Sequence, residues 1–340
     1  MIHRPYYRAT KKIILFLLLG IVVASFRSSN HPFKLSEQYQ VGNVYMGIRL
    51  RGTLELPPTK VNGFRLGQLS GLAWDEDEKL LYALSDRGVI FHLRPLMTNN
   101  ILTGIRFVSA YQLQNKSGHV LKWRDAEGVA ILKGYNGVVG DSQLLIVIEN
   151  TKRIARFNPY GKPLGDHALP KPLQNHKNYA GYNKIIEAVT VHPRFGIITA
   201  PEWPLKEPGK TYSLKGEHKI TLYSLDGQQW TFPAFPAKNS GVVALETLDD
   251  GSILILERAF YSIHTPLVIS LRRVWLSTCQ SVTAGQLTEF EQVAVFDNSQ
   301  GWYIDNFEGL TRHHGAYFFI VSDNNHRHWQ RTLLSYFELY

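Results

Sequence analysis

The sequence has a single cysteine, Cys279, among its 340 residues. It therefore cannot form an intramolecular disulfide, a cysteine-rich zinc site or an iron–sulfur cluster. It also lacks a Gly-x-Ser-x-Gly nucleophile elbow, a glycine-rich phosphate loop and a His-Glu-x-x-His motif. The commonest local signatures of serine hydrolases, nucleotide-binding proteins and zinc proteases are thus missing. No long helical pattern follows residue 26, which argues against a helical bundle.

What is present is typical of a folded, strand-rich protein. Hydrophobic residues make up 44% of the chain and charged residues 19%, which is a globular composition. Aromatic residues reach 12%, and aromatic side chains favour strands. The length fits one large domain or two ordinary ones.

The first 26 residues read as a targeting segment. Residues 1–12 carry four basic side chains and no acid, and residues 13–26 are almost wholly apolar. This run is shorter than the roughly 20 residues of a membrane-spanning helix, so we expect a secretory signal. An uncleaved signal anchor is the alternative, and it would be the protein's only contact with a membrane. Either reading predicts export, to the periplasm or the medium.

The charge balance argues against nucleic acid as a partner. The formal net charge is +9, and loss of residues 1–24 would remove four positive charges and leave about +5. No run of Lys and Arg suited to a phosphate backbone stands out in the rest of the chain.

A repeat organises the remainder. A short apolar strand that follows a small or acidic residue starts near residues 70, 127, 187, 246 and 308, a period of roughly 60 residues. Each recurrence continues through a turn into a second apolar strand, at 80–86, 144–150, 196–202, 252–258 and 317–323. These runs are short and rich in β-branched or aromatic residues, as buried hairpin strands are.

Repeated hairpins of this period predict an all-β protein, a β-propeller with five visible repeats. Weaker strands are expected at 153–159, 220–226, 267–276 and 332–339, and long outer loops at 160–182 and 204–218. Residues 40–56 would either complete the last blade or belong to a sixth. An open solenoid of the same hairpins is the structural alternative. The resulting division is a leader (1–26), an N-terminal segment with a closing strand (27–63) and the propeller (64–340).

Acidic residues mark the same two positions in almost every hairpin. The start of the first strand carries Ser70, Glu127, Glu187, Glu246 and Glu308, and the end of the second carries Asp86, Glu149, Glu202, Glu257 and Asp323. Because antiparallel strands bring these two ends together, an innermost first strand would gather all ten positions around one mouth of the channel. Acids at strand ends also commonly only accept backbone hydrogen bonds, so a purely structural role for these residues is the alternative. Gly71, Gly128 and Gly309 are expected to serve close backbone packing or a bulge.

So many like charges need compensation. One source would be a divalent cation, with calcium expected, because carboxylate and amide oxygens such as that of Asn324 are hard ligands. The other would be the neighbouring bases Arg87, Arg153, Arg258 and Arg327, which could instead bind an anionic substrate. His313, His314, His326 and His328 could ligate a transition metal, but paired histidines in turns are more often solvated.

Seven segments in order resemble one known family. They are SGLAWD…LYALSDRG, DAEGVAI, IEN…RIARF, IEAVTVHP…APEWPL, VVALETLDDGSILILERAF, NFEGLTR and SDNNH…Q. The pattern resembles the esterase-like-activity-of-phytase, or phytase-like, family over residues 64–340. The matching positions are Asp86, Arg87, Glu127, Glu149, Glu187, Glu202, Glu257, Arg258, Glu308, Asp323 and Asn324. Ala188 departs from the family's usual glycine.

The resemblance implies an exported propeller-like domain that hydrolyses phosphate or other esters. In this hypothesis Glu127, Glu187 and Glu308 are innermost and catalytic, as metal ligands or water-orienting groups. Asp86, Glu149, Glu202, Glu257, Asp323 and Asn324 form a second, metal-binding ring, and Arg87, Arg153, Arg258 and Arg327 bind a small anionic ester. The rival hypothesis is a non-catalytic binding module with a structural cation.

Overall fold

The computed structural model describes residues 31–121, 125–181, 184–206, 218–262, 264–276 and 288–340. The predicted leader and Cys279 lie outside these ranges. None of the helices formed by the described residues is both long and apolar enough to cross a bilayer.

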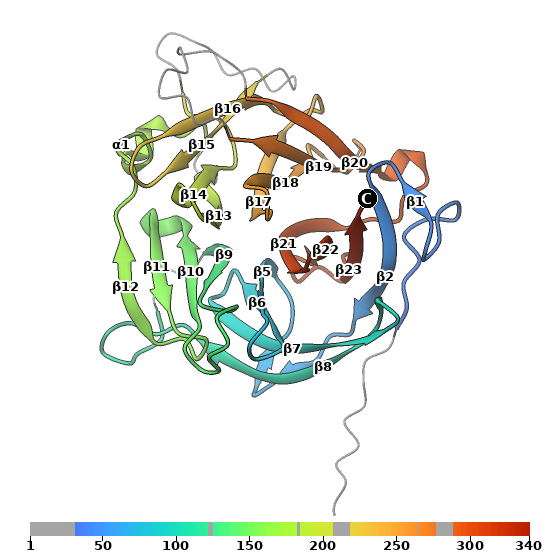
Figure 1. The fold of residues 1–340 in the computed structure, drawn as a ribbon, viewed down its shortest axis with the longest axis horizontal. Helices are drawn as coiled ribbons and strands as arrows, with labels where there is room; N and C mark the ends of the chain where they lie inside the picture. The colour runs from blue at the N-terminus through green and yellow to red at the C-terminus, as the bar shows by residue number, and fades with distance from the viewer. Residues whose placement is uncertain (1–30, 122–124, 182–183, 207–217, 263, 277–287) are drawn as a thin grey trace, which may run out of the picture.

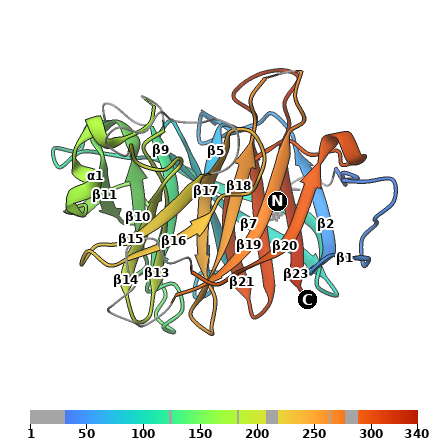
Figure 2. The same ribbon diagram turned by 90° about the horizontal axis from the view of Figure 1, so that it is seen from above.

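Five antiparallel sheets are arranged around a central axis, with strands running between the two faces of a disc (Figures 1 and 2). The first blade is β5 (Leu69–Asp75), β6 (Leu80–Ser85), β7 (Val89–Thr98) and β8 (Ile101–Gln112). The second is β9 (Ala126–Leu132), β10 (Gln143–Ile148), β11 (Arg153–Phe157) and β12 (Pro163–His167). The third is β13 (Ile186–His192), β14 (Gly196–Pro201), β15 (Lys219–Ser224) and β16 (Gln229–Pro233). The fourth is β17 (Ser240–Thr247), β18 (Ser252–Ala259), β19 (Val268–Trp275) and β20 (Phe290–Asp297).

The fifth blade combines the two ends of the chain. It is built from β21 (Asn306–His314), β22 (Tyr317–Asp323) and β23 (Thr332–Leu339), and is completed by β2 (Ile48–Leu56) and β1 (Val44–Tyr45). Strand β2 pairs antiparallel with β23, so residues 40–56 close the ring and do not start a sixth blade. The innermost strands β21 and β5 also contact one another, which excludes the open solenoid.

The remaining elements are short. They are the hairpin β3 (Lys60–Val61) and β4 (Phe64–Arg65), the helix α1 (Lys171–Gln174) and the 3-10 turns η1 (Glu149–Thr151), η2 (His176–Asn178) and η3 (Asn298–Gln300). The five predicted second strands are confirmed to within one or two residues, as are the weaker strands at β11, β15, β19 and β23. The segment 160–182 is not only a loop, because it contains β12 and α1.

The core consists of five apolar clusters, one at each junction between neighbouring blades. Strand β6 shows how the sequence produces this arrangement. Successive side chains of a strand point to opposite faces. Leu81 and Ala83 therefore pack toward the fifth blade, and Tyr82 and Leu84 pack toward the second. A strand covered on both faces is apolar throughout, and this is why the second strands could be predicted from the sequence.

Candidate functional site

A β-bulge interrupts each innermost strand near its start. In the first blade Leu69 pairs with Ser85 and Gly71 with Leu84, which leaves Ser70 unpaired between them. The same irregularity leaves Glu127, Glu187 and Glu308 at the corresponding points of the second, third and fifth blades. A bulge redirects the side chain of its extra residue. The three predicted catalytic glutamates therefore occupy equivalent positions around one mouth of the channel.

Glycines at these bulges let the innermost strands approach closely, as the sequence predicts. A Cβ atom on Gly128 would lie 2.5 Å from the carbonyl oxygen of Glu187, and one on Gly71 would lie 2.8 Å from that of Glu127. Gly309 similarly lies against the backbone of Gly71. Close packing of the strands draws the neighbouring carboxylates into a small space.

The ends of the second strands reach the same mouth. Asp86, Glu149, Glu202 and Asp323 follow or end β6, β10, β14 and β22, beside the bulges. Asp86 accepts a hydrogen bond from the side-chain amide of Gln68 at 2.6 Å, and Glu149 accepts one from the backbone N–H of Ile185 at 3.1 Å. These acids thus also tie adjacent segments together, which is the structural role that the sequence left open.

The fourth blade has a different register from the one that the repeat predicts. Val242 pairs with Glu257 and Ala244 with Leu256, so the bulge position is Val243, and Arg258 follows as the equivalent of Glu202. Glu246 lies three residues farther along the channel, beside Thr311 and Arg312. The mouth therefore carries seven acids and one arginine at the ten equivalent positions, and not nine acids.

Among the acids predicted to bind the metal, Glu257 lies away from the mouth. Its carboxylate is fully buried and lies 3.1 Å from the Nε of Arg272, which is 3% exposed. It also accepts a hydrogen bond from the backbone N–H of Phe235 at 2.8 Å. Burial raises the pKa of Glu257, against the lowering effect of Arg272. This buried pair fastens β18 and β19 to the end of the third blade.

Three carboxylates come close enough to share an ion. One oxygen from each of Asp125, Glu127 and Glu149 lies within 4.8 Å of the other two. Calcium binds oxygens at roughly 2.4 Å, so two ligands of one ion lie at most about 5 Å apart. Asp125 is held in a left-handed conformation with φ of 92° and accepts a hydrogen bond from Asn150 at 3.0 Å. Asp125 was not predicted as a site residue, because it precedes the repeated position, although it starts the segment DAEGVAI.

The electrostatics of these three carboxylates favour the binding of a proton or a cation. Burial, reinforced by the charges of Glu308, Glu149 and Asp125, raises the pKa of Glu127 well above its usual value. Burial and Asp125 raise the pKa of Glu149 to about 8. Burial and Glu127 likewise raise the pKa of Glu187. Carboxyl groups whose ionisation is opposed in this way are relieved by a proton or a cation.

The opposite part of the mouth has its own positive charges. Lys184 contacts both carboxylate oxygens of Glu202, at 2.5 and 2.6 Å, and Arg258 lies 3.2 Å from the same carboxylate. Although burial alone would raise it, the pKa of Glu202 is lowered because these two cations outweigh that effect. Arg258 also pairs with Glu308 and donates to Asn306 at 3.0 Å. The mouth is therefore divided into an acidic part and an ion-paired part.

The three remaining predicted arginines and Asn324 differ in how close they lie to the mouth. Arg87 is exposed beside Asp86, and its charge lowers the pKa of that carboxyl group, which burial raises to about 6. Arg327 is exposed and stacks over Trp329 at 5.6 Å. Arg153 instead pairs with Asp166 of β12 at 3.2 Å, away from the innermost strands. Asn324 accepts hydrogen bonds from the backbone N–H groups of Gln68 and His326, both at 3.1 Å, which fixes the turn after β22.

The histidine pairs are not part of a metal-type cluster within the described residues. The Nδ1 of His313 lies 2.7 Å from the hydroxyl of Tyr336, and burial lowers the pKa of His313 to about 3. His328 makes an edge-to-face contact with Trp329, with ring centroids 4.6 Å apart.

The fold is a five-bladed β-propeller, and the family match supports a hydrolase-like one. A family model described as phytase-like, "esterase-like activity of phytase", matches residues 65–326, and the chain belongs to this family.

The other comparisons find distant propellers. The virginiamycin B lyase of Staphylococcus aureus is 9% identical, with 86% of this chain and 100% of that chain covered and a TM-score of 0.34. The gluconolactonase XC5397 of Xanthomonas campestris is 11% identical, with 89% and 99% covered and a TM-score of 0.37. No curated protein matches this sequence.

Proposed function

We propose that this protein is an exported hydrolase of phosphate or other esters that works with a calcium ion at the acidic mouth. The observation that carries the proposal is the approach of Asp125, Glu127 and Glu149 to within 4.8 Å of one another. Membership of the phytase-like family supports hydrolysis as the reaction class. Export rests on the leader-like residues 1–26, with anchoring through residues 13–26 as the alternative.

The donor set fits a hard divalent cation. All three groups offer carboxylate oxygens, which calcium and magnesium prefer over nitrogen or sulfur ligands. Burial, and after it the like charge of neighbouring carboxylates, raises the pKa values of Glu127 and Glu149, and a bound cation would offset both effects. When bound, the ion would act as a Lewis acid toward an ester oxygen and lower the pKa of a water molecule.

The remaining groups have separate roles in this proposal. Glu187, whose pKa is raised by burial and by Glu127, would act as the general acid that protonates the leaving oxygen. Glu308, fixed by Arg258 and by Asn306 at 2.9 Å, would orient the attacking water. The exposed Arg87 and Arg327 would attract the anionic ester toward the mouth.

The test is hydrolysis of p-nitrophenyl phosphate and p-nitrophenyl acetate by the full chain, with calcium and then with a chelator. We expect turnover that calcium supports, that chelator abolishes, and that Glu127→Gln lowers by at least about 100-fold without loss of folding. Glu257→Gln is the matched control, because this buried glutamate lies away from the mouth. Its turnover per folded molecule should remain near that of the unaltered protein.

Two results would reject the proposal. Turnover that is unaffected by both chelator and Glu127→Gln would place the chemistry elsewhere. The absence of turnover on both esters, together with a melting temperature that chelator lowers, would identify a binding module with a structural cation.

A further inference from the structure

The opposite mouth of the channel contains a separate cavity of about 420 Å³. Its walls come from the far ends of the innermost strands, including Trp74, Ile131, Glu246 and Thr311. Glu127 and Ile131 are four residues apart on β9, so this cavity lies roughly 13 Å along the strand from the acidic mouth. The residues of the proposed calcium site do not line it.

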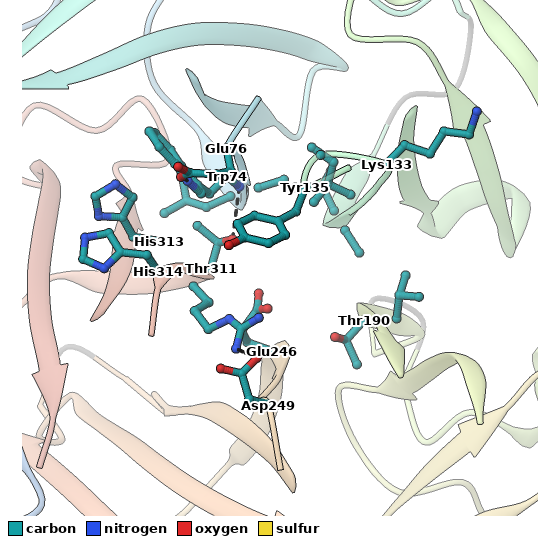
Figure 3. A pocket seen from close by; sticks show the side chains of 18 of the residues that line it. Trp74, Glu76, Lys133, Tyr135, Thr190, Glu246, Asp249, Thr311, His313 and His314 are labelled. Atoms are coloured by element: carbon teal, nitrogen blue, oxygen red, sulfur yellow. Dashed lines mark hydrogen bonds and ion pairs between the residues drawn. The ribbon is translucent and has the colours of Figure 1, made fainter. Parts of the chain in front are cut away.

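An aromatic ring projects over this cavity. Tyr135 follows β9 and is 84% exposed, which is unusual for so large a side chain. Figure 3 shows its ring over the centre of the pocket, with Glu246 and Asp249 on one side and Trp74 and Glu76 on the other. Tyr135 also lines a neighbouring hollow, so much of its ring can be reached from solvent.

The segment that carries Tyr135 is fastened on both sides of it. The carbonyl of Gly134 accepts a hydrogen bond from the backbone N–H of Glu76 at 2.8 Å. The carboxylate of Asp77 accepts from the backbone N–H groups of Asn136 at 2.9 Å and Gly137 at 3.0 Å. The ring is thus presented on an already ordered loop, which reduces the entropy lost when a ligand stacks on it.

The charged groups around the cavity are already paired with one another. Arg312 pairs with Asp249, and Lys79 pairs with Glu76. Lys133 pairs with Asp141 at 3.3 Å and points away from the other labelled side chains (Figure 3). A neutral ligand can bind beside these pairs without disturbing them.

Polar groups lie across from the ring. Glu246 is bonded to the hydroxyl of Thr311 and the backbone of Arg312, and burial raises the pKa of its carboxyl group to about 7. Such a carboxyl can both donate and accept hydrogen bonds near neutral pH. Thr190 adds a hydroxyl at the far wall, bonded to Thr247 at 2.9 Å.

We propose that this cavity binds a neutral polyhydroxylated ring, a sugar, whose C–H face stacks on Tyr135 while its hydroxyls bond to Glu246 and Thr190. An apolar platform facing polar groups matches the two unlike faces of a pyranose. The inference goes beyond the proposed ester hydrolysis and does not depend on it.

The experiment is saturation-transfer NMR of methyl β-glucopyranoside with the full chain. We expect transfer to the glucoside ring protons, and Tyr135→Ala to weaken binding at least 10-fold while Tyr135→Phe preserves it. Tyr160→Ala is the control, because Tyr160 is 48% exposed in the β11–β12 turn and does not line the cavity. Glu127→Gln should leave binding of the glucoside unchanged, which separates this site from the calcium site.

Three outcomes would overturn the proposal. They are the absence of transfer to the glucoside, transfer that survives Tyr135→Ala, and displacement of the glucoside by an equal or lower concentration of glucose 6-phosphate. The last would show that the cavity prefers an anion to a neutral sugar.

Discussion

Arg258 Nη2 lies 3.2 Å from Glu202 Oε1, so the fourth blade supplies a cation where the second and third blades supply acids. The same guanidinium pairs with Glu308 of the fifth blade. Arg258 therefore joins three blades and neutralises Glu202 and Glu308 in the ion-paired part of the mouth.

Removing this cation should destabilise the protein. Arg258→Gln would leave Glu202 and Glu308, which are 2% and 14% exposed, without their shared partner. We expect a loss of about 3 kcal/mol in the free energy of unfolding, measured with urea. Arg153→Gln, which breaks the more exposed pair with Asp166, should cost less than about 1 kcal/mol. Equal losses would show that Arg258 is not a central counter-ion.

Asp125 should be needed for the effect of calcium on stability. With calcium at about 100 times its dissociation constant, binding would stabilise the fold by about 2.7 kcal/mol and raise the melting temperature by roughly 5 °C. Asp125→Asn should remove most of this increase. Asp166→Asn, which alters a 44% exposed acid outside the mouth, should retain it. If calcium raises the melting temperature of Asp125→Asn as much as that of the unaltered protein, the ion binds outside this triad.

The close approach of the innermost strands β9 and β13 at Gly128 should be needed for stability. Gly128→Ala would place a Cβ atom 2.5 Å from the carbonyl oxygen of Glu187 and push β9 away from β13. We expect a loss of about 1 to 3 kcal/mol from overpacking and a weaker response to calcium. Ala188→Gly makes the reverse change at the corresponding position of the next blade and should cost less than about 1 kcal/mol. Thermal unfolding of both variants, with and without calcium, makes the comparison.

Glu246 should make stability depend on pH. Burial raises its pKa from 4.5 to about 7 in the folded protein. A raised pKa in an acid means that its contribution is fully present below pH 4.5 and is lost as pH rises through 7. The unaltered protein should therefore lose up to about 3 kcal/mol over this interval relative to Glu246→Gln. Parallel pH profiles of the two proteins in urea unfolding would contradict this assignment.

The sequence predicts the propeller well because the second strands are buried on both faces. A run such as SILILER at 252–258 has few alternatives to a core strand. The third and fourth strands of the blades are less uniform. Strand β12, for example, alternates between half-buried and exposed residues, and its sequence PLGDH contains proline and glycine. The low β-propensity of this sequence therefore predicts a loop there.

The site is predicted less fully because its geometry depends on bulges. In the fourth blade, Glu246 and Glu257 stand three residues and one residue from the positions that face the mouth. A single extra residue reverses which side chains point inward, and an alignment by acidic residues cannot detect it. Asp125 was missed for a related reason, since its left-handed backbone conformation turns it toward Glu127 and Glu149 from outside the strand.

Strand β2 comes from the start of the chain and pairs with β23 at its end. During synthesis, the ribosome makes residues 48–56 long before residues 332–339, so β2 has no β23 to pair with while the four intervening blades are made. The ring of blades can therefore close only after β23 has been made. A chain exported before folding would reach that event only after its C-terminal residues had crossed the membrane.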